Sequence, residues 1–231
     1  MTQASMGAPM PVHRWPQQAA EALLALQSEA ACVAISVATP DTENRTDARA
    51  SIREALRTLV AEYLKQTAAT IEFSSRSGVA LALLHPAHPM GLSISHAPGC
   101  SVAAVHLRQA VGIDVVRVET NPVEADGAPF EWEQVAHEYL GPAVHQRLAT
   151  TLPTERARAF AQAWSHLEAG LKCLGHGLTE WTPALEQALE CCTFTALDLP
   201  PPLSGTLAVG PTRLSPDRVQ QAYKPSISFK F

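Results

Sequence analysis

Apolar residues recur every three or four positions in several stretches, which is the pattern of helices with one buried face. The clearest stretch is 47–66, whose apolar side chains form a single stripe. A second long stretch opens at Pro153 and ends at Gly175, as expected for a helix with proline in its first turn and glycine after its end. Shorter stretches of the same kind predict helices over 17–27, 130–140 and 143–149.

Short runs of β-branched and apolar residues, bounded by proline, glycine and polar residues, predict strands. In the first half these runs follow one another closely, so we expect an antiparallel meander. The predicted strands of this half cover 31–38, 71–73, 79–84, 92–95, 102–107 and 110–118. Later strands are predicted over 193–199 and 203–209, with an edge strand over 222–231.

The strands cluster instead of alternating with helices, which favours an α+β fold over an alternating α/β fold. Residues 1–16 are rich in proline and small side chains and predict a loose leader. Residues 121–129 combine proline, glycine and acids and mark a boundary between lobes. We therefore expect an N-terminal lobe over 17–120 and a C-terminal lobe over 121–231.

Composition narrows the class of protein. Hydrophobic residues make up 46 % and charged residues 17 % of the 231 positions, which excludes disorder for most of the chain. A net charge of −5 argues against a protein that coats nucleic acid. No apolar run reaches the roughly 18 residues of a membrane helix, and the start lacks a signal-peptide pattern. Five scattered cysteines indicate reduced thiols, so we expect a cytoplasmic protein.

Two short segments combine polar residues with strand ends. Ser95 and His96 end a predicted strand and enter a turn, where a hydroxyl, an imidazole and backbone amides can together bind a phosphate. The alternative is a turn whose serine and histidine bind only local backbone groups. Asp114 lies among apolar residues of a strand, so it needs a cation, a metal or backbone donors if it is buried. Its alternative is an edge-strand acid that faces solvent.

Two predicted helices carry regular rows of functional groups. Phe160, Trp164, Glu168 and Lys172 are four apart and lie along one helix face. The carboxylate can bind a hard cation and the lysine can reach a phosphate, whereas the simpler interpretation is two core aromatics and an exposed ion pair. The second row is a basic ridge along one face of the helix that begins near residue 45, formed by Arg45, Arg49, Arg53 and Arg57.

The ordered set of these segments resembles the 4′-phosphopantetheinyl transferases. The family pattern is a Ser-His turn, a Gly-[Ile/Val]-Asp strand and a Trp-[Ser/Thr] helix with a Glu and a later Lys. Here the pattern is matched by Ser95-His96, by Gly112-Ile113-Asp114, and by 164–172 with Glu168 and Lys172. The closest resemblance is to the longer type, which has two similar α/β lobes related by a pseudo-twofold axis, with the active site in the cleft between them.

The resemblance implies transfer of 4′-phosphopantetheine from coenzyme A to a serine of an acyl or peptidyl carrier protein, by a monomer that uses Mg²⁺. It assigns the magnesium ion to Asp114 and Glu168, and the catalytic roles to Glu168 and Lys172. Lys172 would contact the phosphates, while Arg49, Arg53, Ser95 and His96 would bind the 3′-phosphate of the coenzyme. Nucleic acid and membranes are not expected as partners.

The sequence also departs from the family pattern, and three of the departures remove charges directed at the metal or the coenzyme. A third acid is replaced by Val116, a lysine before the helix glutamate by Leu167, and another lysine by Val79. Losing these charges would weaken a pyrophosphate site. Two alternatives to the enzyme therefore stay open: a non-catalytic member that binds coenzyme A or a carrier protein, and a scaffold subunit of a biosynthetic complex.

Overall fold

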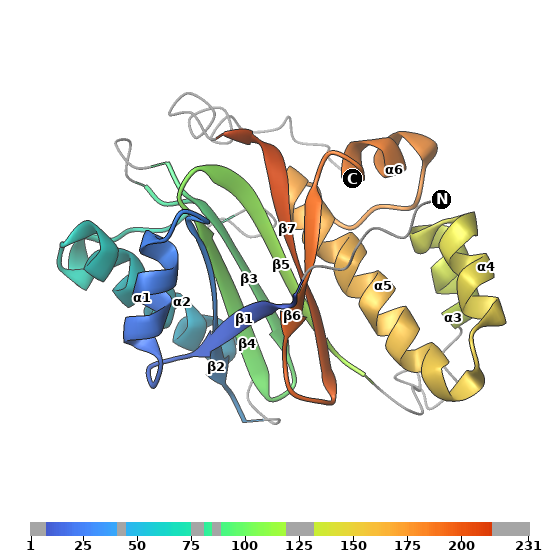
Figure 1. Cartoon of the computed structure of the whole chain (residues 1–231), viewed down its shortest axis with the longest axis horizontal. Helices are drawn as coiled ribbons and strands as arrows, with labels where there is room; N and C mark the ends of the chain where they lie inside the picture. Colours follow the sequence, from blue (N-terminus) through green and yellow to red (C-terminus); the bar gives the residue numbers. More distant parts are fainter. Residues whose placement is uncertain (1–7, 41–44, 75–80, 85–88, 119–131, 214–231) are drawn as a thin grey trace, which may run out of the picture.

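The computed structural model describes residues 8–40, 45–74, 81–84, 89–118 and 132–213, and it shows a mixed α+β fold. Within these ranges seven strands form one sheet, in the order β3-β4-β2-β1-β6-β7-β5 (Figure 1). The two end strands of this order, β3 and β5, lie against each other, so the sheet curls into a nearly closed barrel. The strands are β1 (Met10–Arg14), β2 (Cys32–Ala38), β3 (Gly91–Ala97), β4 (Cys100–His106), β5 (Gln109–Arg117), β6 (Thr193–Asp198) and β7 (Leu203–Arg213).

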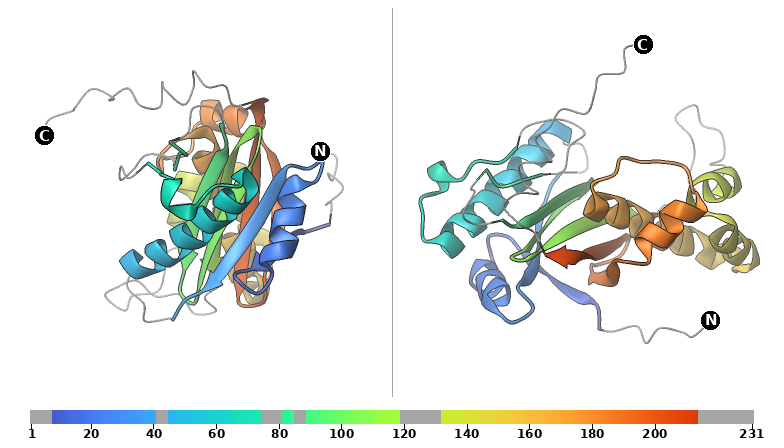
Figure 2. Two further views of the ribbon diagram at one scale, coloured as in Figure 1. Left: turned by 90° about the vertical axis from the view of Figure 1, so that its left-hand side faces the viewer. Right: turned by 90° about the horizontal axis from the view of Figure 1, so that it is seen from above.

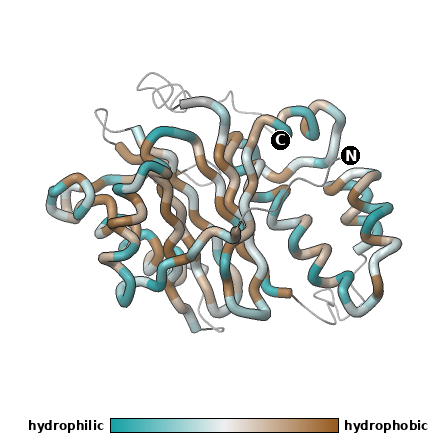
Figure 3. The backbone as a smooth tube through the Cα atoms, in the orientation of Figure 1, coloured by the Kyte–Doolittle hydropathy of each residue, from teal (hydrophilic) through white to brown (hydrophobic). Residues whose placement is uncertain are grey.

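Six α-helices lie within the described ranges, on two sides of the sheet. Helices α1 and α2 pack on one side, and α5 packs on the other (Figure 2). Hydrophobic residues are concentrated along the strands (Figure 3), because the strands face both the helices and one another. The helices are α1 (Ala19–Gln27), α2 (Arg45–Leu64), α3 (Trp132–Val135), α4 (Pro142–Thr150), α5 (Pro153–Leu174) and α6 (Pro183–Leu189), with a π-helical turn over Ala136–Leu140 and a 3₁₀ turn over Ala68–Thr70.

The same connection occurs twice along the chain. In β2-α2-β3-β4 and again in β5-α5-β6-β7, a strand is followed by a long helix and then by a hairpin. In the first set β2 and β3 both pair antiparallel with β4, and in the second set β5 and β6 both pair antiparallel with β7. Strand β1 runs parallel to both β2 and β6 and joins the two sets into one sheet.

Helix α5 begins and ends where the sequence predicts, whereas α2 is shifted by two residues, to Arg45–Leu64 from the predicted 47–66. Pro153 lies in the first turn of α5, and Gly175 follows its last residue with a φ of 74°. This left-handed conformation suits glycine and lets the amide of His176 donate to the carbonyl of Leu171 at 2.8 Å. Helix α2 already begins at Arg45, so the four arginines of the basic ridge belong to one helix.

Several predicted elements differ from the structure. The loose leader over 1–16 is wrong for Met10–Arg14, because these residues form β1 between two parallel partners. The antiparallel meander is correct for β3 and β4 only, since β5 leaves β4 and pairs with β7. The predicted strands over 71–73 and 79–84 are reduced to one bridge between Phe73 and Leu83 in the described part of this segment.

Other predictions fall outside the described residues. These are the boundary loop over 121–129, Val79 and the edge strand over 222–231. Helix α6 is not among the predicted elements. It is seven residues long and begins after Thr182, whose side chain accepts a hydrogen bond from the amide of Leu185. Among the described helices none is both long enough and apolar enough to cross a membrane.

We expect the buried side chain of His106 to make the fold less stable in acid. Its Nδ1 accepts hydrogen bonds from the amides of Arg108 and Gln109, at 3.1 Å each, so the folded state favours the neutral ring. Burial lowers the pKa of His106 below its usual 6.5, and the charge of Arg108 adds to this effect. Below pH about 6.5 the unfolded chain therefore binds a proton that the folded chain excludes, and the free energy of unfolding falls until the pH reaches the lowered pKa.

The measurement is urea unfolding between pH 5 and 8, compared with His106→Asn, which keeps an acceptor near the two amides but does not titrate. The variant should show a smaller loss of stability on acidification than the unmodified chain. Equal losses would show that other groups cause the acid sensitivity.

Candidate functional site

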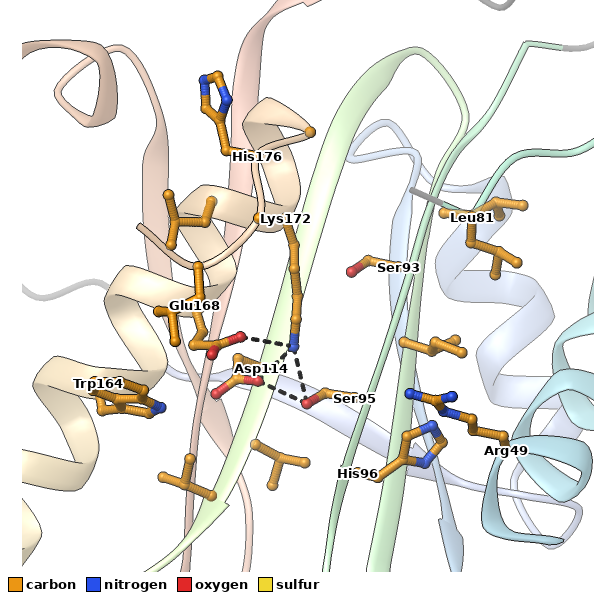
Figure 4. A pocket seen from close by; sticks show the side chains of 18 of the residues that line it. Arg49, Leu81, Ser93, Ser95, His96, Asp114, Trp164, Glu168, Lys172 and His176 are labelled. Atoms are coloured by element: carbon orange, nitrogen blue, oxygen red, sulfur yellow. Dashed lines mark hydrogen bonds and ion pairs between the residues drawn. The ribbon is translucent and has the colours of Figure 1, made fainter. Parts of the chain in front are cut away.

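A cavity of about 510 Å³ lies where α2, β3, β5 and α5 meet. Its lining includes side chains from both halves of the chain. Figure 4 shows Asp114, Glu168 and Lys172 on one side of the cavity and Arg49 with His96 on the other. All seven residues that the sequence analysis selected are in this lining: Arg49 and Arg53 from α2, Ser95 and His96 from β3, Asp114 from β5, and Glu168 and Lys172 from α5.

Asp114 is the most deeply placed charged group of this cavity, with 4 % of its surface exposed. Its Oδ1 accepts hydrogen bonds from the hydroxyl of Ser95 at 2.7 Å and from Nζ of Lys172 at 2.6 Å. Its Oδ2 is buried and has no hydrogen-bond partner among the described residues. Burial raises the pKa of Asp114, although the ammonium of Lys172 and the hydroxyl of Ser95 act in the opposite direction.

Lys172 connects the two carboxylates of the site. Its Nζ lies 2.6 Å from Oδ1 of Asp114 and 3.6 Å from Oε2 of Glu168, and it also donates to the carbonyl of Ile113 at 3.3 Å. The side chains of Lys172 and Glu168 are 29 % and 26 % exposed, so both reach the cavity and solvent. A positive charge therefore lies between two carboxylates, with one of them open to ligands.

Gly112 allows α5 to approach β5 closely enough for these contacts. A Cβ atom at this position would lie 1.9 Å from the carbonyl oxygen of Ala169 and 2.5 Å from the amide nitrogen of Cys173. Both atoms belong to the α5 backbone and cannot be moved by a change of rotamer. The glycine that precedes Asp114 by two residues thus sets the distance from which Glu168 and Lys172 reach across to the strand.

The opposite wall is cationic. Arg49 and Arg53 are one helical turn apart on α2 and both line the cavity. Figure 4 shows the guanidinium of Arg49 next to the ring of His96, whose Nδ1 lies 2.8 Å from Oγ of Ser101. This wall can bind an anion, and it faces the carboxylate and lysine wall.

The donor set fits a magnesium ion. Magnesium is usually held by one or two carboxylates together with water and substrate phosphates, and Asp114 and Glu168 provide two carboxylates on one side of the cavity. The buried Oδ2 of Asp114 lacks the partner that such an ion would supply. No group of three potential metal-ligating side chains occurs in the described ranges, and Val116 lines the cavity where the resemblance would place a third acid.

Comparison with known proteins bears on the same residues. Residues 110–200 match the family model of the 4′-phosphopantetheinyl transferase superfamily. The match supports the resemblance over this part of the chain. The matched superfamily consists of transferases, which is the class that the resemblance implied. No curated protein matches the chain.

The match to the transferase superfamily covers only part of the cavity. It includes Asp114, Glu168 and Lys172, whereas the α2 and β3 side chains precede it. Of the departures noted above, Val116 lies in the cavity lining and Leu167 is buried among the helices α4, α5 and α6. The side chain of Leu167 therefore faces away from the cavity.

The cavity lining also includes residues that the sequence analysis did not select, and two of them follow the end of α5. His176 and Leu178 follow the end of α5 and form part of the rim, with Leu178 54 % exposed. Their position one to two turns after Lys172, just beyond a helix-ending glycine, is the signal that would have found them.

Proposed function

We propose that this protein transfers 4′-phosphopantetheine from coenzyme A to a serine of an acyl or peptidyl carrier protein, with Mg²⁺. The proposal rests on one observation, namely that two walls of different chemistry face each other in one cavity. One wall holds Asp114, Glu168 and Lys172, and the other holds cations from α2. Coenzyme A has a pyrophosphate and a separate 3′-phosphate, so it offers an anion to each wall.

Each wall has a distinct task in the proposed reaction. Arg49, Arg53 and His96 bind the 3′-phosphate, and Nζ of Lys172 binds the pyrophosphate and stabilises the charge that grows on the leaving group. Asp114 and Glu168 hold the magnesium ion, which when bound neutralises charge on the pyrophosphate oxygens. The partly exposed carboxylate of Glu168 accepts the proton of the carrier serine.

The bonds and charges of this step balance. The serine oxygen forms a bond to the phosphorus that carries the pantetheine arm. The bond from that phosphorus to the bridging oxygen breaks, and adenosine 3′,5′-bisphosphate leaves with the electron pair. The serine proton goes to Glu168 and from there to solvent.

We also propose that the two β-α-β-β sets form two similar lobes related by a pseudo-twofold axis. The equal order of elements and the equal strand pairing support this arrangement. The cavity would then lie in the cleft between the lobes, since α2 and β3 belong to the first set and β5 and α5 to the second.

The test is intact-mass measurement of an apo carrier protein after incubation with this protein, coenzyme A and Mg²⁺. The expected result is a gain equal to one phosphopantetheine group on the carrier. A panel of acyl and peptidyl carrier proteins that all keep their mass would contradict the transfer.

A non-catalytic protein that binds coenzyme A or a carrier protein is the second candidate. Val116 favours it, because an apolar side chain lines the cavity beside Asp114 and supplies no ligand for a cation. Calorimetry separates the candidates: binding of coenzyme A without any mass gain on the carrier would support the second, and neither binding nor transfer would favour a scaffold.

We expect Arg53→Ala to weaken the binding of coenzyme A more than that of 3′-dephospho-coenzyme A. Removing one charge-assisted contact to a phosphate should lower the affinity for coenzyme A about tenfold to a hundredfold. The ligand without the 3′-phosphate should lose little. Titration calorimetry with both ligands measures the difference, and Arg57→Ala is the control because Arg57 donates to the carbonyl of Ile71 and lies outside the cavity lining. Equal losses for both ligands would place Arg53 away from the 3′-phosphate.

A further inference from the structure

The hydroxyl of Ser95 is committed to the carboxylate wall. It donates to Oδ1 of Asp114 at 2.7 Å and accepts from Nζ of Lys172 at 3.2 Å. Ser95 is 6 % exposed, so these contacts are shielded from water. This placement differs from the phosphate-binding role that the resemblance implied for Ser95.

A serine hydroxyl has one proton to donate. A phosphate oxygen only accepts hydrogen bonds, so a phosphate at Ser95 would take the proton that now serves Asp114. The carboxylate of Asp114 would then lose a donor in a buried place, which is costly. The phosphate role and the observed contact therefore exclude each other.

The geometry of β3 separates Ser95 from the cationic wall. Successive side chains of a strand point to opposite faces. Figure 4 shows Ser95 directed toward Asp114 and Lys172, whereas the ring of His96 lies next to Arg49. The side chain of His96 therefore belongs to the cationic wall, and that of Ser95 to the wall formed by Asp114, Glu168 and Lys172.

We propose that Ser95 is a positioning residue that orients Asp114 for the divalent cation and does not bind the 3′-phosphate. This inference rests on the proposed function. With Oδ1 held by Ser95 and Lys172, Oδ2 stays available for an ion. Donors to a metal-binding carboxylate commonly control the affinity of the metal in this way.

The test is titration calorimetry of the full chain with coenzyme A and with 3′-dephospho-coenzyme A, each with and without Mg²⁺. Ser95→Ala should weaken both ligands by the same factor, about tenfold, when Mg²⁺ is present. The loss should vanish when Mg²⁺ is left out. Ser95→Thr, which keeps the hydroxyl, should restore the affinity.

Ser93→Ala is the matched control. Ser93 lies two residues earlier on β3, lines the same cavity and is equally buried at 6 %. Its hydroxyl accepts from the amide of Ile113 at 3.0 Å and does not contact Asp114. This variant should lower the melting temperature without changing the dependence of binding on Mg²⁺.

Three outcomes would overturn the inference. A loss confined to the ligand that carries the 3′-phosphate would show that Ser95 binds this phosphate, and the proposed function would stand. An unchanged affinity in Ser95→Ala would show that its hydroxyl does not affect the cation site. Failure of the unmodified chain to bind either ligand would overturn the proposed function and this inference with it.

Discussion

Asp114→Asn should reduce phosphopantetheine transfer about a hundredfold to a thousandfold, the scale of losing one group that stabilises transition-state charge. The amide is close in shape to the carboxylate but lacks the negative charge that binds a cation and Lys172. The measurement is the rate at which an apo carrier protein gains phosphopantetheine mass. The fold should persist, because the substitution removes a buried charge and leaves Glu168 near the lysine.

Glu168→Gln tests the other carboxylate under the same conditions. Its rate should fall as well, and the double variant should be little slower than either single variant, because residues that serve one ion do not contribute additively. Gln162→Ala on the same helix is the control, since its amide donates to the hydroxyl of Thr206 and Gln162 is absent from the cavity lining. If Asp114→Asn keeps the full rate, the carboxylate wall is not part of the reaction.

Gly112→Ala should destabilise the fold by about 3 kcal/mol, the upper end for forcing extra atoms into a packed core. The added Cβ would collide with the backbone of α5 at Ala169 and Cys173, so the helix must move away from β5. In a chain of this size the melting temperature should fall by roughly 10 °C. Transfer should fall further than stability alone explains, because Glu168 and Lys172 move with the helix.

Gly177→Ala is the control for this substitution. A Cβ at Gly177 meets no atom within 4 Å, so its melting temperature should stay within a degree or two of the unmodified chain. Calorimetric melting of both variants makes the comparison. A melting temperature of Gly112→Ala that equals that of Gly177→Ala would mean that α5 tolerates a larger distance from the sheet.

Local patterns were enough to find the helices that carry the site. Helix α5 has a proline start, a glycine end and a regular apolar face, so its extent and the common face of Glu168 and Lys172 followed from the sequence. The sequence also predicted that Asp114, if buried, needs a cation, a metal or backbone donors as its partner. In the structure the ammonium of Lys172 is such a partner.

Pairings between distant segments could not be derived from local patterns. Strand β1 is five residues long and obtains its stability from β2 and β6, so its own residues carry no distinct periodicity. The partner of β5 is β7, about ninety positions later, which no hydrophobic pattern indicates. The role of Ser95 depends on the same long-range geometry. Ser95 is on β3 and its partner Asp114 is on β5, and these two strands meet only when the sheet curls.

The distribution of charge around the cavity determines how an anion meets this protein. Three cations, Arg49, Arg53 and Lys172, and two carboxylates line the cavity, whereas the whole chain carries −5. At physiological ionic strength a charge is screened beyond about 8 Å, so an approaching polyanion responds to the cationic groups only when it is almost at the opening. At greater range the net charge repels it, and dissolved salt weakens that repulsion as well as the attraction. Electrostatic attraction therefore acts on the anion only close to the opening of the cavity, and long-range steering does not contribute to its binding.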